Sequence, residues 1–377
     1  ATNAIQELSV ITGSFAAEYG QAMSGVVNIV TKDPSHDYTG SLSLMGGDML
    51  SNYNIDDNEK IREEVKPYNL NNLREVEASL SGPIPLINDL KFFTSLRHFN
   101  REGTLFGLTK YNSLEERRIA MERGDSLGLL QSEDEQQVFS LNPDTKINAQ
   151  GKMIYYLNRS MKLQYTALYE NDKWKSYSHS RRFIEDGHYQ NEKNALNHIL
   201  KLNHQVSQNT FYSIGLSNTT NEYKYFAYDD INDLRYVSAD FYRQDDNYEF
   251  YTGGTNNSRY DRVTITNLIQ GQLTTQLGSQ HEVKMGFDIK QHDFKLEQKS
   301  IEVDLRDEPW YDVNNNGSYD EDEPFNDING NGIWNNATDI NGDDIPGNAI
   351  LPEEDLYANE FHNQPTEFSV FLQDKIE

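Results

Sequence analysis

The sequence has 377 residues, of which 36% are hydrophobic and 25% are charged. No apolar run approaches the roughly 20 residues of a membrane-spanning helix, which excludes a helical membrane protein but not a β-barrel, whose strands alternate apolar and polar residues. The formal net charge of −27 argues against a nucleic-acid partner, and the absence of cysteine excludes disulfides and thiolate chemistry.

Residues 4–32 contain two short segments of strand character around a turn rich in glycine and small residues. The first segment reads ELSVIT and the second reads GVVNIVTK. The second is almost continuously apolar from Val26 to Val30, which is typical of a strand that is buried on both faces. We therefore expect a small buried core here, ahead of a long sheet that is apolar on one face only.

Several later segments alternate apolar and polar residues with a period of two, which indicates strands with one apolar face. In HEVKMGFDIKQ, this pattern places Val283, Met285, Phe287 and Ile289 on one face. The other segments place these sets together: Leu163, Tyr165, Ala167 and Tyr169; Tyr212, Ile214 and Leu216; Phe368, Val370 and Leu372.

Ten strands follow from this pattern, and the connections between them alternate in length. The expected ranges are 38–47, 73–82, 90–100, 149–157, 162–172, 194–206, 209–225, 261–277, 281–297 and 365–377. The second, fourth, sixth and eighth connections are short, and the other five are long and polar. Strict alternation is typical of outer-membrane barrels, which have short turns on the periplasmic side and long loops outside.

The N-terminal stretch resembles the end of the plug domain of TonB-dependent outer-membrane receptors. The matching residues are Gly13, Ala17, Glu18, Tyr19, Gly20, Gly25, Asn28, Thr31 and Lys32, from the segments AEYG and NIVTK and the glycines around them. Further along, LSGPIP with LKFFTSL, HEVKMGFDIK and NQPTEFSVFLQDKIE resemble barrel strands of the same family. The resemblance covers nearly the whole chain apart from its loops and is most specific in the plug-end motif.

The resemblance implies an all-β fold, namely an antiparallel transmembrane β-barrel preceded by the end of a plug domain. It assigns residues 1–35 to the plug end and 36–377 to the first part of the barrel, with an acidic insert at 302–355. About ten strands are present, whereas barrels of this family have about 22. Because no signal peptide precedes the chain and both ends look cut, we expect a fragment of a longer protein.

The resemblance also implies a function for the whole protein. It would be an outer-membrane transporter of a Gram-negative-type bacterium that binds a scarce extracellular ligand and imports it with energy from the TonB complex. Its partners would be outer-membrane lipid, that complex and the ligand, with the long loops facing outward. A siderophore, cobalamin, a glycan and a peptide all remain open as ligands.

A tandem acidic motif lies in the longest connection. The first copy fits positions 1, 3, 5, 7, 9 and 12 of the EF-hand calcium loop, with Gly317 at the turn position: Asp312, Asn314, Asn316, Ser318, Asp320 and Glu323. Alternating side-chain oxygens suit the six to eight oxygen ligands of Ca²⁺. The flanking prolines of EPWY and EPF argue against flanking helices, so the loops are closer to helix-poor calcium repeats.

The second copy is weaker. It supplies Asp327, Asn329, Asn331 and Asn335, but Thr338 stands at its twelfth position, so Asp339 is the acid that would substitute. Between Glu302 and Asp355 the chain has 16 acids and one base, which favours a bound cation over an empty loop. We expect structural Ca²⁺, although a solvated loop without metal is the alternative for both copies.

Catalysis has little support, and we expect no enzyme. The nine histidines form no pair with metal-ligand spacing, and neither a nucleophile elbow nor a phosphate-binding loop is present. His198 and His204 share one expected strand and are expected to face the lumen or solvent. The alternative to a transporter is a calcium-stabilised surface β protein for adhesion or binding, whose apolar strand faces would pack sheet on sheet.

Overall fold

The computed structural model consists almost entirely of antiparallel strands. It describes residues 4–12, 20, 24–48, 69–109, 138–231, 251, 255–302, 313, 319–320, 323–324, 349–350 and 358–376. The elements are β1 (Ile5–Ile11), β2 (Val26–Thr31), β3 (Thr39–Gly47), β4 (Leu73–Pro83), β5 (Leu90–Arg101), β6 (Phe106–Leu108), β7 (Val138–Ser140), β8 (Asp144–Asn158), β9 (Met161–Lys175), the 3₁₀ turn η3 (His179–Arg181), β10 (Gln190–Gln205), β11 (Thr210–Phe226), β12 (Ser258–Leu277), β13 (His281–Glu302), β14 (Ala349–Ile350), β15 (Ala358–Asn363) and β16 (Thr366–Ile376). Among these residues no helix is both long and apolar enough to cross a membrane.

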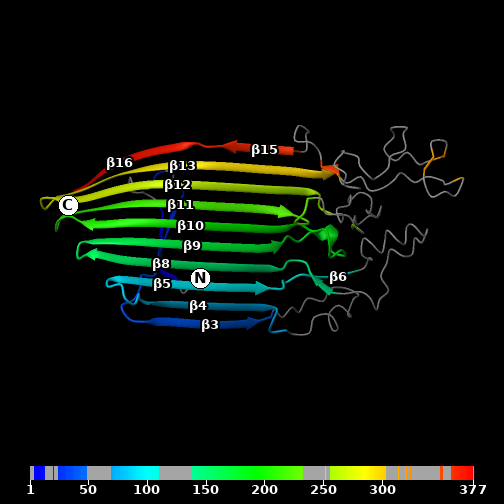
Figure 1. The fold of residues 1–377 in the computed structure, drawn as a ribbon, viewed down its shortest axis with the longest axis horizontal. Helices are drawn as coiled ribbons and strands as arrows, with labels where there is room; N and C mark the ends of the chain where they lie inside the picture. Colours follow the sequence, from blue (N-terminus) through cyan, green and yellow to red (C-terminus); the bar gives the residue numbers. More distant parts are fainter. Residues whose placement is uncertain are drawn as a thin grey trace.

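One sheet of twelve strands dominates the molecule (Figure 1). Its order follows the chain from β3 through β4, β5 and β8 to β13, and β14, β15 and β16 all pair with β13. All ten expected strands are present. The structure adds β15 beside β13 and the short hairpin of β6 and β7, neither of which was predicted from the sequence.

The alternation of connection lengths is confirmed by the strand ends. Residues 84–89, 159–160, 206–209 and 278–280 form the short turns, which all lie at one end of the sheet (Figure 1). Gly278 has φ +67°, a left-handed conformation that suits glycine in a tight turn. The long connections therefore leave from the opposite end, referred to below as the loop end.

The strand registers show that one face of the sheet is apolar across many strands. Cross-strand partners form a continuous row of seven apolar or aromatic side chains: Met153, Tyr165, Leu200, Leu216, Ile269, Ile289 and Phe368. The row beside it contains Tyr155, Leu163, Leu202, Ile214, Phe287 and Val370. Nearly all of the side chains in these two rows are exposed or half-exposed. We call the surface that these rows and their apolar neighbours form the apolar belt, and the face that carries it the outer face.

The apolar belt runs obliquely to the register rows. On β3 and β4 the exposed apolar residues of this face are Leu42, Leu44, Val76 and Leu80, and the row through Leu42 reaches Leu196 on β10. On β13, by contrast, the belt lies closer to the short turns, at Met285, Phe287 and Ile289. A band that is level in a membrane must cross the rows obliquely when the strands tilt, as they do in barrels by about 35–45°.

Beyond the belt, toward the loop end, the outer face becomes charged. Lys173 lies 2.8 Å from Glu192, and Lys224 lies 2.6 Å from Glu222 and 3.4 Å from Asp261. These residues face each other across β9 to β12, so the strands continue well past the apolar section. With 15 to 22 residues each, strands β8 to β13 exceed the roughly 9–11 residues that cross a bilayer.

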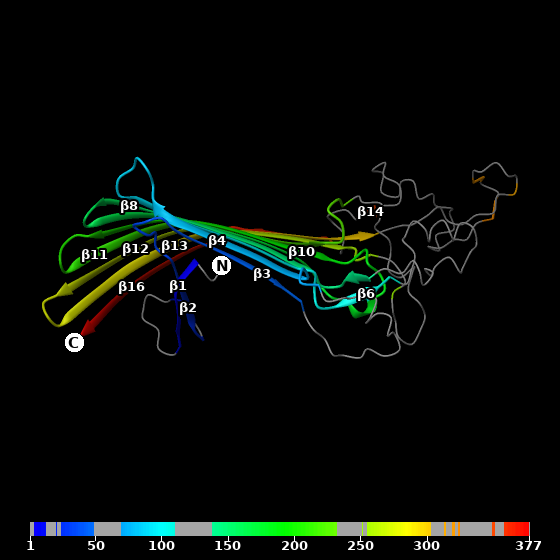
Figure 2. The ribbon, with the colours of Figure 1, turned by 90° about the horizontal axis from the view of Figure 1, so that it is seen from below.

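The two N-terminal strands lie on the concave side of the sheet (Figure 2). β1 and β2 pair only with each other, in antiparallel register. The expectation of burial on both faces is wrong for the described structure, because Val27 and Ile29 are 61% and 53% exposed. A continuous apolar run indicates a strand that can be buried on both faces. Among the described residues, however, no second layer covers the apolar side chains of β1 and β2.

The two faces of β11 differ at neighbouring residues, which allows a matched test. The resemblance found in the sequence predicts lipid on the outer face, so replacing Leu216 by Lys should destabilise the complete protein by about 2–4 kcal/mol, because the ammonium would enter the hydrocarbon layer. Replacing the adjacent Ser217 by Lys should cost close to nothing, since this side chain faces the polar interior. Denaturant titration of the complete protein folded into lipid bilayers measures both, and equal effects would contradict the assignment of faces.

Candidate functional site

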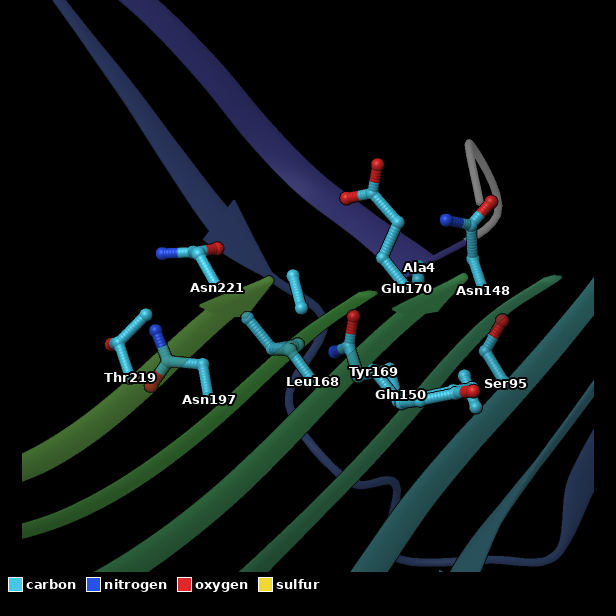
Figure 3. Close-up of a pocket in the computed structure, with 12 residues that line it drawn as sticks. Ala4, Ser95, Asn148, Gln150, Leu168, Tyr169, Glu170, Asn197, Thr219 and Asn221 are labelled. Atoms are coloured by element: carbon cyan, nitrogen blue, oxygen red, sulfur yellow. The ribbon is translucent and has the colours of Figure 1, made fainter. Parts of the chain in front are cut away.

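The inner face of the sheet is polar, and the N-terminal strands enclose a hollow against it. The hollow measures about 300 Å³ and lies between Ala4, at the start of β1, and the wall formed by β5 and β8 to β11. Figure 3 shows Asn148, Glu170 and Asn221 rising from the wall toward the two strands. Further polar side chains that line it are Ser95, Gln150, Asn197 and Thr219. The hollow therefore offers amide, hydroxyl and carboxylate groups.

Two polar atoms of the side chains that line the hollow are buried without a hydrogen-bond partner. They are Nε2 of Gln150, which is a donor, and Oδ1 of Asn197, which is an acceptor. An unsatisfied buried polar group costs about 1–3 kcal/mol, so such atoms favour occupation by water or by a polar ligand. The hollow is suited to molecules that both donate and accept hydrogen bonds.

Charged groups on the inner face pair with one another across the strands. Arg97 lies 2.7 Å from Glu75, and Lys193 lies 3.1 Å from Glu170. A separate chain of contacts links four further residues: Arg101 to Asp144 at 3.3 Å, Asp144 to Lys146 at 3.7 Å, and Lys146 to Asp172 at 3.4 Å. The wall is thus charged but locally neutral.

An aromatic cluster lies on the inner face at the loop end. Trp174, Asn191, Tyr225 and Tyr260 are successive cross-strand partners on β9 to β12. The rings of Tyr225 and Tyr260 stack at 5.1 Å between centroids, and Trp174 lies 6.1 Å from Tyr223 at 21°. We call Trp174, Tyr189, Tyr223, Tyr225 and Tyr260 the aromatic tray; its rings are only partly buried.

Asn191 fixes the geometry of the tray from below. It is buried, its Oδ1 accepts a hydrogen bond of 2.8 Å from the Tyr223 hydroxyl, and its Nδ2 donates to Ser176 Oγ at 3.0 Å. The short amide leaves room for Trp174 and Tyr223 to approach above it. Tyr189 contacts the Tyr225 ring edge-on at 4.9 Å, and the Arg262 guanidinium lies 5.9 Å from the centre of the Tyr223 ring.

Lys152 on β8 fastens the N-terminal strands to the wall. Its side chain is nearly fully buried, and its ammonium donates to the Thr31 carbonyl oxygen at 3.1 Å and pairs with the Asp33 carboxylate. The linker that follows is held by β4, since Ser35 N donates to Ser81 Oγ at 2.8 Å and Tyr38 hydroxyl donates to the Pro83 carbonyl at 2.9 Å. The position of the hollow depends on these contacts.

The connection at 176–189 is tied to its neighbours beside the tray. Tyr251 N donates to the Ser180 carbonyl at 2.8 Å, and the Arg181 guanidinium lies 4.7 Å from the Tyr251 ring. His188 is buried and its Nε2 bonds the Ile184 carbonyl at 2.6 Å. Burial lowers the pKa of His188, and the positive charge of Arg181 lowers that pKa further. The imidazole is therefore neutral near pH 7, with Nε2–H as the donor.

Most of the expected calcium ligands lie outside the described residues: Asp312, Asn314, Asn316, Ser318, Asp327, Asn329, Asn331, Asn335 and Asp339. Asp320 and Glu323 are described. Glu323 is 6% exposed, and its carboxylate accepts hydrogen bonds from Val313 N at 2.8 Å and Asp320 N at 3.1 Å. Within the described part of the chain, no three His, Asp or Glu side chains form a group that could hold a metal.

The expected plug-end residues are only partly described, since Gly13, Ala17, Glu18 and Tyr19 lie outside that set. Gly20 lies in a turn, Gly25 precedes β2, and Asn28 pairs with Ser9 on β1. Thr31 is the residue that contacts Lys152, and Lys32 N bonds the Ala4 carbonyl at 2.9 Å. The motif thus forms the ribbon and its attachment to the wall.

Of the two expected surroundings of His198 and His204, lumen or solvent, the lumen is wrong. His198 and His204 share the outer face of β10 with Leu196, Leu200 and Leu202 and do not face the lumen. His198 Nδ1 lies 2.7 Å from the Tyr165 hydroxyl, and the His204 ring contacts Tyr212 edge-on. The Tyr165 hydroxyl gives the His198 ring a polar partner, whereas His204 Nδ1 is buried without a hydrogen-bond partner. The strand pattern alone does not reveal either arrangement.

Comparison with known proteins rests on structure, because no family model and no curated protein matches the sequence. The outer-membrane transporter YddB from Escherichia coli superposes with a TM-score of 0.59 and 10% identity, covering 99% of this chain and 41% of that one. The pyoverdine receptor FpvA from Pseudomonas aeruginosa, bound to pyoverdine, gives 0.54 and 13%, covering 99% and 43%. The fold is that of the TonB-dependent outer-membrane receptors.

The closed form of the ferric-catecholate import receptor Fiu from Escherichia coli gives a TM-score of 0.50 and 12% identity, covering 98% of this chain and 52% of that one. The chain thus spans about two fifths to one half of the length of these receptors. The suspected family fold and the expected partial antiparallel barrel are confirmed. The expected boundary between plug end and barrel at residue 35 stays a prediction.

Sequence reasoning named no ligand-contacting residue, and it missed the aromatic tray and Lys152. One signal was present for the tray. On β11 the apolar positions are even-numbered, at Tyr212, Ile214 and Leu216, whereas Tyr223 and Tyr225 fall on the opposite, polar face. Aromatic residues on the polar face near a strand end indicate a binding surface. Lys152 in GKMIYY carried no such signal, because its partners lie about 120 residues earlier.

The Lys152 contact can be tested by a double-mutant cycle in the complete protein. Lys152→Met should weaken the attachment of Thr31 and Asp33 by about 1–2 kcal/mol, a discounted value because Asp33 is exposed. Asp33→Asn should add little in the Lys152→Met background. Amide hydrogen exchange of residues 31–35 measures the effect, and unchanged exchange in Lys152→Met would contradict the assigned role.

The neutral state of His188 predicts a pH dependence of the loop at 176–189. The lowered folded-state pKa means that unfolding binds a proton below about pH 6.5, so local stability is complete above that pH and falls as pH decreases through it. The protection factors of this loop, which correct amide exchange for its intrinsic pH dependence, should therefore decrease on acidification. In His188→Gln this decrease should vanish, and persistence of the same pH profile would contradict the explanation.

Proposed function

We propose that the chain is part of an outer-membrane receptor that binds an extracellular ligand and imports it with energy transmitted by the TonB complex. The observation that carries this proposal is the division of one sheet into an apolar outer face and a polar inner face, with the N-terminal strands held against the inner one. A bilayer requires the first face, and a lumen that conducts polar molecules requires the second.

The ends of the sheet support an orientation. The short turns lie at one end and the long connections at the other, as in outer-membrane barrels with the loops outside the cell. The aromatic tray is at the loop end and would be the first surface that an incoming ligand meets. The hollow at Ala4 lies deeper, where the N-terminal strands approach the wall. Movement of these strands would connect the two sites.

The adhesin alternative receives less support. It predicts that the apolar strand faces pack sheet on sheet, yet on the described strands the apolar belt is exposed. Burial of so much apolar surface needs either lipid or a second sheet. The receptor proposal names lipid, and the fold shared with YddB and FpvA agrees with that choice.

We further propose that Ca²⁺ binds the acidic loops and has a structural role there. Residues 302–355 have a strong excess of negative charge, and the spacing of oxygen ligands fits a calcium loop. The return of the Glu323 carboxylate to Val313 N and Asp320 N brings position twelve close to positions two and nine, which supports a closed loop. Neutralisation by calcium would allow the neighbouring aromatic residues to pack.

Cell fractionation tests the receptor proposal. The product of the complete gene should appear in the outer membrane and should migrate faster on gels before boiling than after it, because an intact barrel resists unfolding by detergent. Recovery in the soluble fraction without a mobility shift would overturn the proposal and favour the calcium-stabilised adhesin. Uptake assays on cells with and without TonB then test the energy coupling.

Limited proteolysis tests the calcium proposal. Calcium should protect residues 302–355 from cleavage, and chelation should remove the protection. Glu323→Gln should abolish it, because the twelfth ligand would lose its charge and its bidentate binding. Asp355→Asn, which has the same charge change outside the loop pattern, is the matched control. Equal cleavage with calcium and with chelator would show that the loops hold no metal.

A further inference from the structure

We infer that the aromatic tray binds a neutral carbohydrate ring. The inference rests on the proposed receptor function and adds the chemical class of its ligand. Three independent features of the inner face support it: the arrangement of the rings, the hydrogen-bonding groups beside them, and the pairing of nearby charges.

The rings of the tray form a broad, partly exposed apolar surface within a polar wall. Tyr225 and Tyr260 are parallel to within 4°, and Trp174 and Tyr223 to within 21°, while Tyr223 is inclined by 63° to Tyr225 and by 59° to Tyr260. The C–H groups on one face of a sugar ring are weakly positive and pack against the negative face of an aromatic ring. Two pairs of rings inclined to each other, one of them fixed from below by Asn191, offer such faces at low entropic cost.

The polar groups below the tray include amides beside the paired charges of Lys193 and Glu170. Asn221 is two residues from Tyr223 on the same face of β11, and Asn197 and Gln150 follow deeper in the wall. Amide side chains both donate and accept, which matches the hydroxyl groups of a sugar. The unpartnered Asn197 Oδ1 and Gln150 Nε2 continue this pattern into the hollow.

The charges argue against an anionic ligand at this wall. Lys146 and Lys193 on the inner face pair with Asp172 and Glu170. Arg262, which lies 5.9 Å from the centre of the Tyr223 ring, is the one cation at the tray that forms no ion pair among the described residues. A single guanidinium suits a neutral sugar hydroxyl, whereas a ferric chelate that carries several negative charges would need several cations not already balanced by acids.

Titration calorimetry on the complete protein, purified from outer membranes in detergent, tests the inference. The probes are neutral hexasaccharides of glucose, mannose and xylose, with ferric tris-catecholate as the anionic contrast. Binding of at least one hexasaccharide is expected. Trp174→Ala and Tyr260→Ala should each weaken it about tenfold, the size of one lost stacking contact.

Two control variants separate stacking from general disturbance. Tyr260→Phe keeps the ring and should bind within about twofold of the native protein. Tyr155→Ala removes an aromatic residue of similar exposure from the outer face and should leave binding unchanged. The mobility shift on boiling confirms that each variant is folded.

The inference is overturned if no neutral hexasaccharide binds, if binding survives both Trp174→Ala and Tyr260→Ala, or if only the ferric chelate binds. In that last case the protein is still a receptor, and only the ligand class is wrong. A protein absent from the outer membrane would instead overturn the proposed function itself, so the two failures are distinguishable.

Discussion

The structure depends on one constraint, which is that backbone N–H and C=O groups must find partners within the sheet when neither face can supply them. Among the described residues, antiparallel pairing from β3 to β16 meets this requirement without an α-helix. The side chains on the two faces of the sheet can then suit two different surroundings, an apolar one outside and a polar one inside. Leu216 and Ser217 are adjacent in the chain yet face opposite surroundings, so a shift of one residue in register would exchange them.

Ion pairing between side chains of neighbouring strands explains the composition of the inner face. Long basic side chains in a wall of amides could attract anions without selectivity, but Arg97, Lys146 and Lys193 each have a carboxylate on a neighbouring strand. Such pairs are partly exposed and contribute little individually to stability. Their larger effect is to define where a ligand finds unpaired groups, which are mostly amides, hydroxyls and aromatic rings.

Much of the fold was predictable because period-two alternation is a local property. Val283 to Ile289 shows it within seven residues, and the strand exists as expected. Three expected strands were shorter than the observed ones, which extend to Asp144, Gln190 and Glu302, because charged residues there make a strand resemble a loop. Cross-strand ion pairs join the segments at Asp144 and Gln190 to their neighbouring strands, and those pairs depend on register, which no single segment contains. For the same reason the aromatic tray was not predicted, since four strands contribute to it.

The charged continuation of the strands beyond the apolar belt has a consequence for the binding surface. On β10 the belt reaches Leu196, whereas Asn191 under the tray lies five residues further, or about 17 Å along the strand. In the proposed orientation the tray belongs to the charged part of the strands that extends above the lipid headgroups. A thicker or thinner bilayer would change the fit at the belt, but this extended part would keep its shape. Ligand capture would therefore be insulated from the lipid composition that governs the stability of the rest of the wall.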